Sequence, residues 1–212
     1  MEEHIKVKKT FRYFSYGNPK KAKCLWIILH GYGQLPAFFI RKFHSLNPDE
    51  HFVIAPEGMH RFYLEGTSGR VGASWMTKES RLTDIEDNNR FLNALSKQIL
   101  SNYNFDKKIL LGFSQGGATA CRWHEMGNFK ASIFILWASV FPPDLELPKK
   151  NNAFINSKNI FVIGDDDPYY NKEKIQEMKA DLTNSNINFS SLEYKGGHNI
   201  NTEALEKLIT RI

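Results

Sequence analysis

The chain has 212 residues, of which 42% are hydrophobic and 24% are charged. This length and composition suit one well-filled α/β domain over residues 1–212, and they leave too little chain for two domains of ordinary size. The formal net charge of +5 at pH 7 comes from lysines and arginines scattered in small groups, so no long basic run indicates a nucleic-acid partner.

Three features favour a cytoplasmic protein. The N-terminus is acidic and is not followed by an apolar run of signal-peptide length. The longest apolar stretch, residues 24–29, is too short to span a bilayer, so we expect no membrane insertion. Cys24 and Cys121 are interpreted as free thiols of a reducing compartment, with a single disulfide between them as the alternative.

The first part of the chain predicts strands, one helix and a long loop. Residues 5–14 are rich in β-branched and aromatic side chains, which favours an edge strand or a short hairpin. The continuous apolar run at 24–29 is typical of a central parallel strand. Helical spacing predicts a helix over 36–46, and residues 52–55 predict the next strand. From 57 to 81 the sequence indicates a loop whose aromatic content and length suggest a functional role.

The remainder alternates helices with buried strands. A helix is expected to begin at Thr83, whose spacing to Glu86 matches a capping box. One apolar face of this helix is expected to carry Ile85, Leu92, Leu95 and Ile99. Later strands are expected at 107–111, 132–137, 160–163 and 188–194, and helices at 171–182 and 202–212. This alternation predicts a doubly wound, mostly parallel sheet. The connection over 139–159 is too short for a folded cap domain.

Residues 110–117, Leu-Leu-Gly-Phe-Ser-Gln-Gly-Gly, place a Gly-x-Ser-x-Gly pattern between an apolar strand and a small-residue helix start. This is the pattern of a nucleophile elbow, in which a serine occupies a sharp strand-to-helix turn. Gly112 and Gly116 keep the crowded turn free of bulk. Ser114 is therefore the predicted nucleophile. The alternative is a glycine-rich turn that contains a serine by chance.

A serine hydroxyl needs a base to take its proton, and the base needs a carboxylate to orient it. In open parallel sheets such groups lie on loops just after the strands. Two loops fit, Gly-Asp-Asp-Asp-Pro at 164–168 and Lys-Gly-Gly-His at 195–198. The order Ser, Asp, His is that of an α/β-hydrolase, so His198 is the predicted base. The alternatives are a surface histidine and a solvated acidic turn or weak cation site.

The oxyanion hole is expected to consist of two backbone N–H groups. One is expected to belong to Gln115, the residue after the nucleophile, and the other to Tyr32 in the His-Gly-Tyr-Gly sequence at 30–33. Those glycines also permit a tight turn, and the two interpretations are compatible. No metal site is expected, because neither His-Glu-x-x-His nor a carboxylate–histidine cluster at ligand spacing occurs.

Together these motifs resemble the phospholipase/carboxylesterase family of α/β-hydrolases, which includes acyl-protein thioesterases and small bacterial carboxylesterases. The resemblance runs from about residue 25 to residue 198 and rests on the motifs at 30–33, 112–117, 164–168 and, in shortened form, 195–198. It implies a compact α/β-hydrolase fold without a cap domain. It also implies Asp167, the residue before Pro168, as the acid of a Ser114–His198–Asp167 triad.

The chain departs from the family at positions that lie near the acyl and alcohol pockets by analogy. These are Gln34, where the family often has Asp, Met76 and Thr77 in Ser-Trp-Met-Thr, and Tyr169 and Tyr170 after Asp-Pro. The catalytic assignment is therefore expected to hold, whereas the substrate class is open. The entrance is expected to be walled by Tyr32, Trp75, Tyr169 and Tyr170, of which the last three are the expected substrate-binding residues.

The expected activity is hydrolysis of small-molecule carboxylic esters of short to medium acyl length, through an acyl-enzyme and without a cofactor. A thioesterase is the alternative enzyme. A catalytically inactive hydrolase fold that binds a small molecule or partner is the alternative of a different class. The sequence leaves the oligomeric state open.

Overall fold

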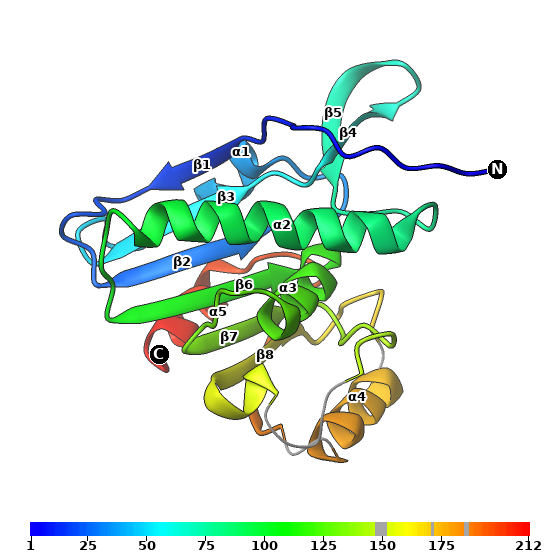
Figure 1. The fold of residues 1–212 in the computed structure, drawn as a ribbon. Coiled ribbons are helices and arrows are strands. Elements are labelled where there is room, and N and C mark those ends of the chain that lie inside the picture. The colour runs from blue at the N-terminus through cyan, green and yellow to red at the C-terminus, as the bar shows by residue number, and fades with distance from the viewer. Residues whose placement is uncertain (147–151, 171, 185–186) are drawn as a thin grey trace.

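The computed structural model describes residues 1–146, 152–170, 172–184 and 187–212. Within these residues the main sheet has the strand order β1-β3-β2-β6-β7-β8-β9, and β4 and β5 form a separate hairpin (Figure 1). The main strands are β1 (Tyr13–Tyr16), β2 (Cys24–Leu29), β3 (His51–Pro56), β6 (Lys107–Phe113), β7 (Ile133–Trp137), β8 (Lys158–Gly164) and β9 (Phe189–Tyr194). Only β1 is antiparallel to its neighbour in this sheet.

Helices cover both faces of the sheet. They are α1 (Pro36–Phe39), α2 (Arg81–Leu100), α3 (Gln115–Met126), α4 (Lys172–Asn184), α5 (Thr202–Ile209) and the short 3₁₀-helices η1 (Ile40–Phe43) and η2 (Ala153–Asn156). Alternate side chains of β2 divide between two cores, because successive residues of a strand point to opposite faces. Leu25 and Ile27 belong to the core that α2, α3 and α4 cover, whereas Trp26 belongs to the core under α1, η1 and α5. The sheet is therefore doubly wound, as predicted.

The buried strands lie where the sequence predicts them, with ends that differ by one or two residues. The helix expected over 36–46 is shorter, because an α-helical turn gives way to η1 at Ile40. The helix expected over 202–212 ends at Ile209. The first residue of the helix expected over 171–182 and residues 147–151 of the connection over 139–159 lie outside the described residues.

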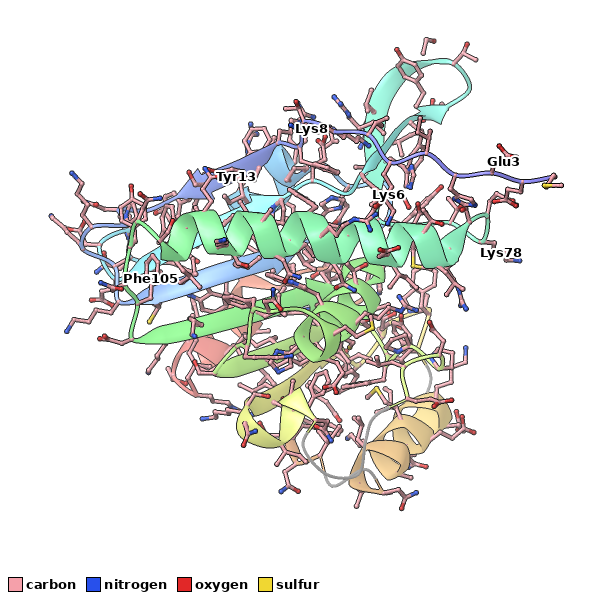
Figure 2. The ribbon with its side chains drawn as sticks, in the orientation of Figure 1. Glu3, Lys6, Lys8, Tyr13, Lys78 and Phe105 are labelled. Atoms are coloured by element: carbon pink, nitrogen blue, oxygen red, sulfur yellow. The ribbon has the colours of Figure 1, made fainter. Side chains whose placement is uncertain are left out.

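The N-terminal expectation is largely wrong. Only Tyr13–Tyr16 form a strand, and residues 1–12 run as an extended segment past α2 and the β4–β5 hairpin, where Figure 2 marks Glu3, Lys6 and Lys8. Phe11 stacks on Phe91 of α2 with ring centroids 4.1 Å apart. Phe11 therefore packs onto a helix, whereas Tyr13 and Phe14 belong to the edge strand β1.

The interval from 57 to 81 is not a long loop. β4 (His60–Glu65) and β5 (Ser68–Ser74) form an antiparallel hairpin, joined by a two-residue turn at which Gly66 has a φ of 59°. Two-residue hairpin turns need such positive φ values, which glycine adopts without strain. In Figure 1 the hairpin projects from the upper edge of the molecule.

The start of α2 also differs from the prediction. The helix begins at Arg81, and Ser80 is its N-cap, with φ 48° and ψ 35° and no side-chain capping bond. Thr83 therefore lies inside the first turn, and no capping box forms with Glu86. The apolar face is nevertheless present, since Leu92, Leu95 and Ile99 are buried.

No cap domain covers the sheet in the part of the chain that the structure describes. Between β7 and β8 the described residues contain one short element, η2, which packs against α3. Among the described helices, none combines the length and apolar character needed to cross a membrane.

Candidate active site

Ser114 lies at the sharp turn between β6 and α3. Its backbone has φ 53° and ψ −123°, outside the regions that non-glycine residues usually occupy. A Cβ atom at Gly112 would lie 2.5 Å from the Cα of Gly117, and one at Gly116 would lie 2.4 Å from the carbonyl oxygen of Leu29. Both positions therefore require glycine, and the turn has the geometry of a nucleophile elbow.

The structure brings Ser114, His198 and Asp167 together in one hydrogen-bonded row. The Nε2 atom of His198 lies 2.8 Å from the Oγ of Ser114, and its Nδ1 atom lies 2.8 Å from the Oδ2 of Asp167. The Asp167 side chain is fully buried, and that of His198 is 17% exposed. An ionised Asp167 accepts the proton of Nδ1, which leaves Nε2 as the acceptor for the Ser114 hydroxyl.

The loop that carries His198 is fixed on both sides. The hydroxyl of Tyr194 lies 3.0 Å from the carbonyl oxygen of Gly197 and 2.6 Å from that of Asn199. The indole Nε1–H of Trp137 donates to the same Asn199 oxygen at 3.0 Å. Burial raises the pKa of Tyr194, which keeps its hydroxyl protonated as a donor. Sequence reasoning missed this support, since a tyrosine within a strand shows no sign of such a contact.

The three consecutive aspartates have different surroundings. Asp167 binds His198 through Oδ2, while its Oδ1 accepts the backbone N–H of Tyr169 at 3.0 Å. Asp165 accepts the backbone N–H of Gly196 at 2.9 Å and so ties the loop after β8 to the loop after β9. Asp166 is exposed. Only Asp167 contacts the imidazole.

Two backbone N–H groups are available beside the nucleophile. Neither Tyr32 N–H nor Gln115 N–H donates to any acceptor among the described residues. The loop that holds Tyr32 is nevertheless secured: Gly31 N–H donates to the Gln34 side chain at 2.9 Å, and Gly33 N–H donates to the Ala73 carbonyl at 2.9 Å. Fixed donors without an acceptor are what an oxyanion hole needs.

The side chain of Gln115 connects the elbow to the residues after β5. Its Oε1 accepts the backbone N–H of Trp75 at 3.1 Å, and its Nε2 donates to the carbonyl oxygen of Met76 at 2.9 Å. The start of α3 is thereby held against the chain that leaves the hairpin. The expected role of Gln115 is through its backbone, and this side-chain contact is an addition that the sequence did not reveal.

Trp75 does not wall the entrance, so this expectation is wrong. Its side chain is fully buried, and its indole N–H donates to the carbonyl oxygen of His30 at 2.8 Å. Asn88 of α2 donates to the Trp75 carbonyl at 2.8 Å. Trp75 therefore fills the core behind the site. Its indole N–H can be buried there because the His30 carbonyl accepts its hydrogen bond.

Two of the three tyrosines expected at the entrance, Tyr169 and Tyr170, lie beside His198. Tyr169 is 64% exposed, with its ring centroid 4.6 Å from that of His198, and the ring of Tyr170 lies 6.1 Å from His198. Burial raises the pKa of Tyr170, and the charge of Asp167 raises it further. Tyr32 is 60% exposed and packs against Phe62 of the hairpin at 5.1 Å.

A cleft of about 680 Å³ opens beside His198, between the loop at 33–35, α1 with η1, and the hairpin. Its apolar walls are Leu35, Phe38, Phe39, Leu64, Val71 and Ile200. Two cationic side chains, Lys42 and Arg70, also line it. Sequence analysis missed these walls because it interpreted the hairpin as a loop. In the described chain, no group of three or more His, Cys, Asp or Glu side chains is placed to hold a metal ion.

A doubly wound parallel sheet with a serine elbow after β6, an acid after β8 and a histidine after β9 defines the α/β-hydrolase class. A family model described as "Serine hydrolase (FSH1)" matches residues 19–207. The chain therefore belongs to this serine hydrolase family. No curated protein matched the sequence.

Solved structures agree on the fold. A carboxylesterase from Mesorhizobium loti is 17% identical with a TM-score of 0.75, and covers 95% of this chain and 93% of its own. Esterase PE8 is 21% identical with a TM-score of 0.71, covering 97% and 98% of the two chains. Acyl-protein thioesterase 2 from Zea mays is 20% identical with a TM-score of 0.66, covering 94% and 96%. The predicted α/β-hydrolase fold is confirmed.

Proposed function

We propose that this serine hydrolase cleaves carboxylic esters of small molecules, with Ser114 as nucleophile, His198 as general base and acid, and Asp167 as the residue that orients His198. The observation that carries the proposal is the unbroken row of hydrogen bonds from the Ser114 hydroxyl to the buried carboxylate of Asp167. This row matches the geometry in which a base within hydrogen-bond reach activates a serine.

In the proposed reaction, Nε2 of His198 takes the proton of Ser114 as Oγ forms a bond to the ester carbonyl carbon. The resulting oxyanion accepts hydrogen bonds from the N–H groups of Tyr32 and Gln115. When the carbonyl reforms, the bond to the alcohol oxygen breaks and the alcohol leaves with the proton from His198. A water molecule then attacks the acyl-enzyme with His198 as base, which releases the carboxylic acid and restores the Ser114 hydroxyl.

Short to medium, water-soluble acyl esters are the proposed substrates. The open cleft beside His198 and the absence of a cap in the described chain support access without any opening step. Thioester cleavage uses the same nucleophile and oxyanion hole, and the fold similarity to a plant acyl-protein thioesterase keeps it as the second candidate. A cytoplasmic location is part of the proposal and is supported by the free thiols of Cys24 and Cys121.

The test is covalent labelling with a fluorophosphonate probe, followed by mass spectrometry of the labelled peptide. We expect one adduct, on Ser114, and no adduct in the Ser114→Ala variant. Matched oxygen esters and thioesters of the same acid, assayed by release of acid, then separate the two activities. A folded protein that neither reacts with the probe nor hydrolyses any ester would instead be an inactive hydrolase fold that binds its ligand.

A further inference from the structure

The cleft beside His198 contains cationic side chains without anionic neighbours. Lys42 comes from η1 and Arg70 from β5, and no aspartate or glutamate lines the cleft with them. Neither side chain forms a hydrogen bond or an ion pair with a described residue. Two elements far apart in the chain thus bring two unneutralised positive charges to one side of the catalytic histidine.

Several arginines of the protein are paired with carboxylates. Arg12 and Arg61 both reach the buried carboxylate of Glu57, at 2.6 Å and 3.4 Å. Arg122 binds Asp144 at 2.6 Å. Lysines such as Lys20, Lys78 and Lys97, however, also lack a hydrogen-bond or ion-pair partner for their side chains among the described residues. What distinguishes Lys42 and Arg70 is therefore their shared position on an apolar-walled cleft beside His198.

The cations are set among apolar walls. Phe38 is 60% exposed and Leu64 is 38% exposed, and both line the same cleft as Lys42 and Arg70. Arg41 lies over the Phe38 ring with its guanidinium carbon 5.0 Å from the centroid, which adds a further positive charge at the rim. Such a surface fits a ligand with an apolar portion and a negative charge, because the apolar walls can bury the apolar portion while the exposed Lys42 and Arg70 attract the negative charge.

We propose that the preferred ester carries an anionic group, a carboxylate or a phosphate, separated from the scissile carbonyl by an apolar segment, and that Lys42 and Arg70 bind this group. The proposal rests on the proposed esterase function and adds a substrate class to it. The planar guanidinium of Arg70 can bind two oxygens of such a group side by side, whereas the ammonium of Lys42 acts as a point charge.

Three pairs of substrates test this. The acyl-side pair is the mono-p-nitrophenyl ester of adipic acid and the same ester with its free acid methylated. The alcohol-side pair is the butyrate ester of hydroxyhexanoic acid and that of its methyl ester. The third pair replaces that carboxylate with a phosphate monoester and its neutral dimethylated counterpart. The three pairs locate the anionic group on the acyl or the alcohol side and distinguish carboxylate from phosphate.

We expect the anionic member of at least one pair to have a kcat/KM at least about fivefold higher than its neutral partner, mainly through a lower KM. The Lys42→Gln/Arg70→Gln variant is expected to remove this preference, and Lys42→Glu/Arg70→Glu to reverse it. The charge-preserving exchange Lys42→Arg/Arg70→Lys is expected to keep most of it. Lys20→Glu is the control that leaves the preference unchanged, because Lys20 is exposed and precedes β2, at the opposite ends of the parallel strands from His198.

Raising the salt concentration is a second measurement that does not depend on variants. The preference for the anionic ester should shrink when salt shortens the range of exposed charges, while turnover of the neutral ester stays constant. Equal kcat/KM within all three pairs at low salt would overturn the anion proposal and leave the esterase function intact. No hydrolysis of any ester, together with no probe adduct on Ser114, would instead overturn the proposed function itself.

Discussion

The Nε2 atom of His30 accepts a hydrogen bond from the backbone N–H of Gly58 at 3.0 Å, while its Nδ1 atom lies 2.8 Å from the carbonyl oxygen of Gly31. Both contacts are satisfied only by a neutral ring that carries its proton on Nδ1. The side chain is fully buried, and burial lowers the pKa of His30 to about 4. A neutral histidine therefore fixes the strand end from which the loop of Tyr32 departs.

This burial predicts a loss of stability on acidification. In the unfolded chain His30 takes up a proton near pH 6.5, whereas in the folded protein it does so only near pH 4. Between these pH values the unfolded state therefore binds more protons than the folded state. His124 is also buried, and burial lowers its pKa to about 4. The free energy of unfolding should be unaffected by these groups above pH 6.5 and should fall as pH drops, by about 2–3 kcal/mol for each histidine near pH 4.5.

Urea unfolding near pH 7 and near pH 4.5 measures this effect. The His124→Asn variant, which removes one of the two groups, is expected to be less stable near neutral pH and to lose less stability between the two pH values. Equal losses for this variant and the unaltered protein would contradict the assignment.

Removal of the nucleophile or the base is predicted to abolish most turnover. Ser114→Ala and His198→Ala are each expected to lower kcat for ester hydrolysis by about 10⁴ or more, because both groups act in the same proton transfer. The double variant is expected to be little worse than either single one. Steady-state kinetics of the three variants test this, and losses that simply multiply would argue against a shared triad.

The three aspartates are predicted to differ in their effect on kcat. Asp167→Asn should lower kcat by about 10² to 10⁴, because Asn no longer holds the tautomer in which Nε2 of His198 accepts a proton. Asp166→Asn, an exposed and matched control, should change kcat by less than about tenfold. Asp165→Asn also leaves the imidazole untouched and should stay within the same limit. A crippling effect of Asp166→Asn would show that the acid is misassigned by one residue.

Gln115→Ala is predicted to weaken the elbow without touching the triad. The change removes the bonds to Trp75 N–H and the Met76 carbonyl, leaves that N–H buried without an acceptor, and should cost about 1–3 kcal/mol of unfolding free energy. If the side chain also positions its own backbone N–H, kcat should fall by about tenfold or more while KM changes little. Gln115→Glu, which keeps the acceptor for Trp75 but not the donor, is expected to be intermediate. A variant with unchanged kcat would limit the side chain to a structural role.

A series of p-nitrophenyl esters is predicted to show rates that rise with acyl length and then fall. Each buried methylene adds about 0.8 kcal/mol of binding until the cleft ends. Because no cap covers the described sheet edge, no activation is expected when the substrate exceeds its solubility limit. A jump in rate on emulsion formation, or rates that continue to rise with long-chain esters, would contradict this.

The sequence allowed prediction of the elements that are buried on both faces. β2 and β6 show as continuous apolar runs because helices cover them on either side, and the residues after such strands are few enough to search for an acid and a base. The hairpin was missed for the opposite reason. Most of β4 and the first half of β5 are exposed, so solvent imposes no alternation of apolar and polar side chains.

Because the β4–β5 hairpin was not predicted, the walls of the cleft beside His198 were not predicted either. Arg70 and Lys42 line the same cleft only because the hairpin is placed beside η1, and neither position carries a local sequence signal of a binding role. Trp75 was expected to wall the entrance because, by analogy with the family, the Ser-Trp-Met-Thr positions lie near the acyl and alcohol pockets. Its burial depends on a carbonyl of His30 that is remote in the sequence.

Ser114 and His198 are 84 residues apart in the chain, and His198 follows the last strand. During synthesis the residues of the elbow are therefore made well before His198, the proposed base. A chain interrupted anywhere before His198 contains an unactivated serine, and its hydroxyl is no more reactive than that of a surface serine. In the proposed mechanism, hydrolytic chemistry therefore becomes available only when β9 has joined β8 at the edge of the sheet, and an incomplete copy has the elbow without an activated nucleophile.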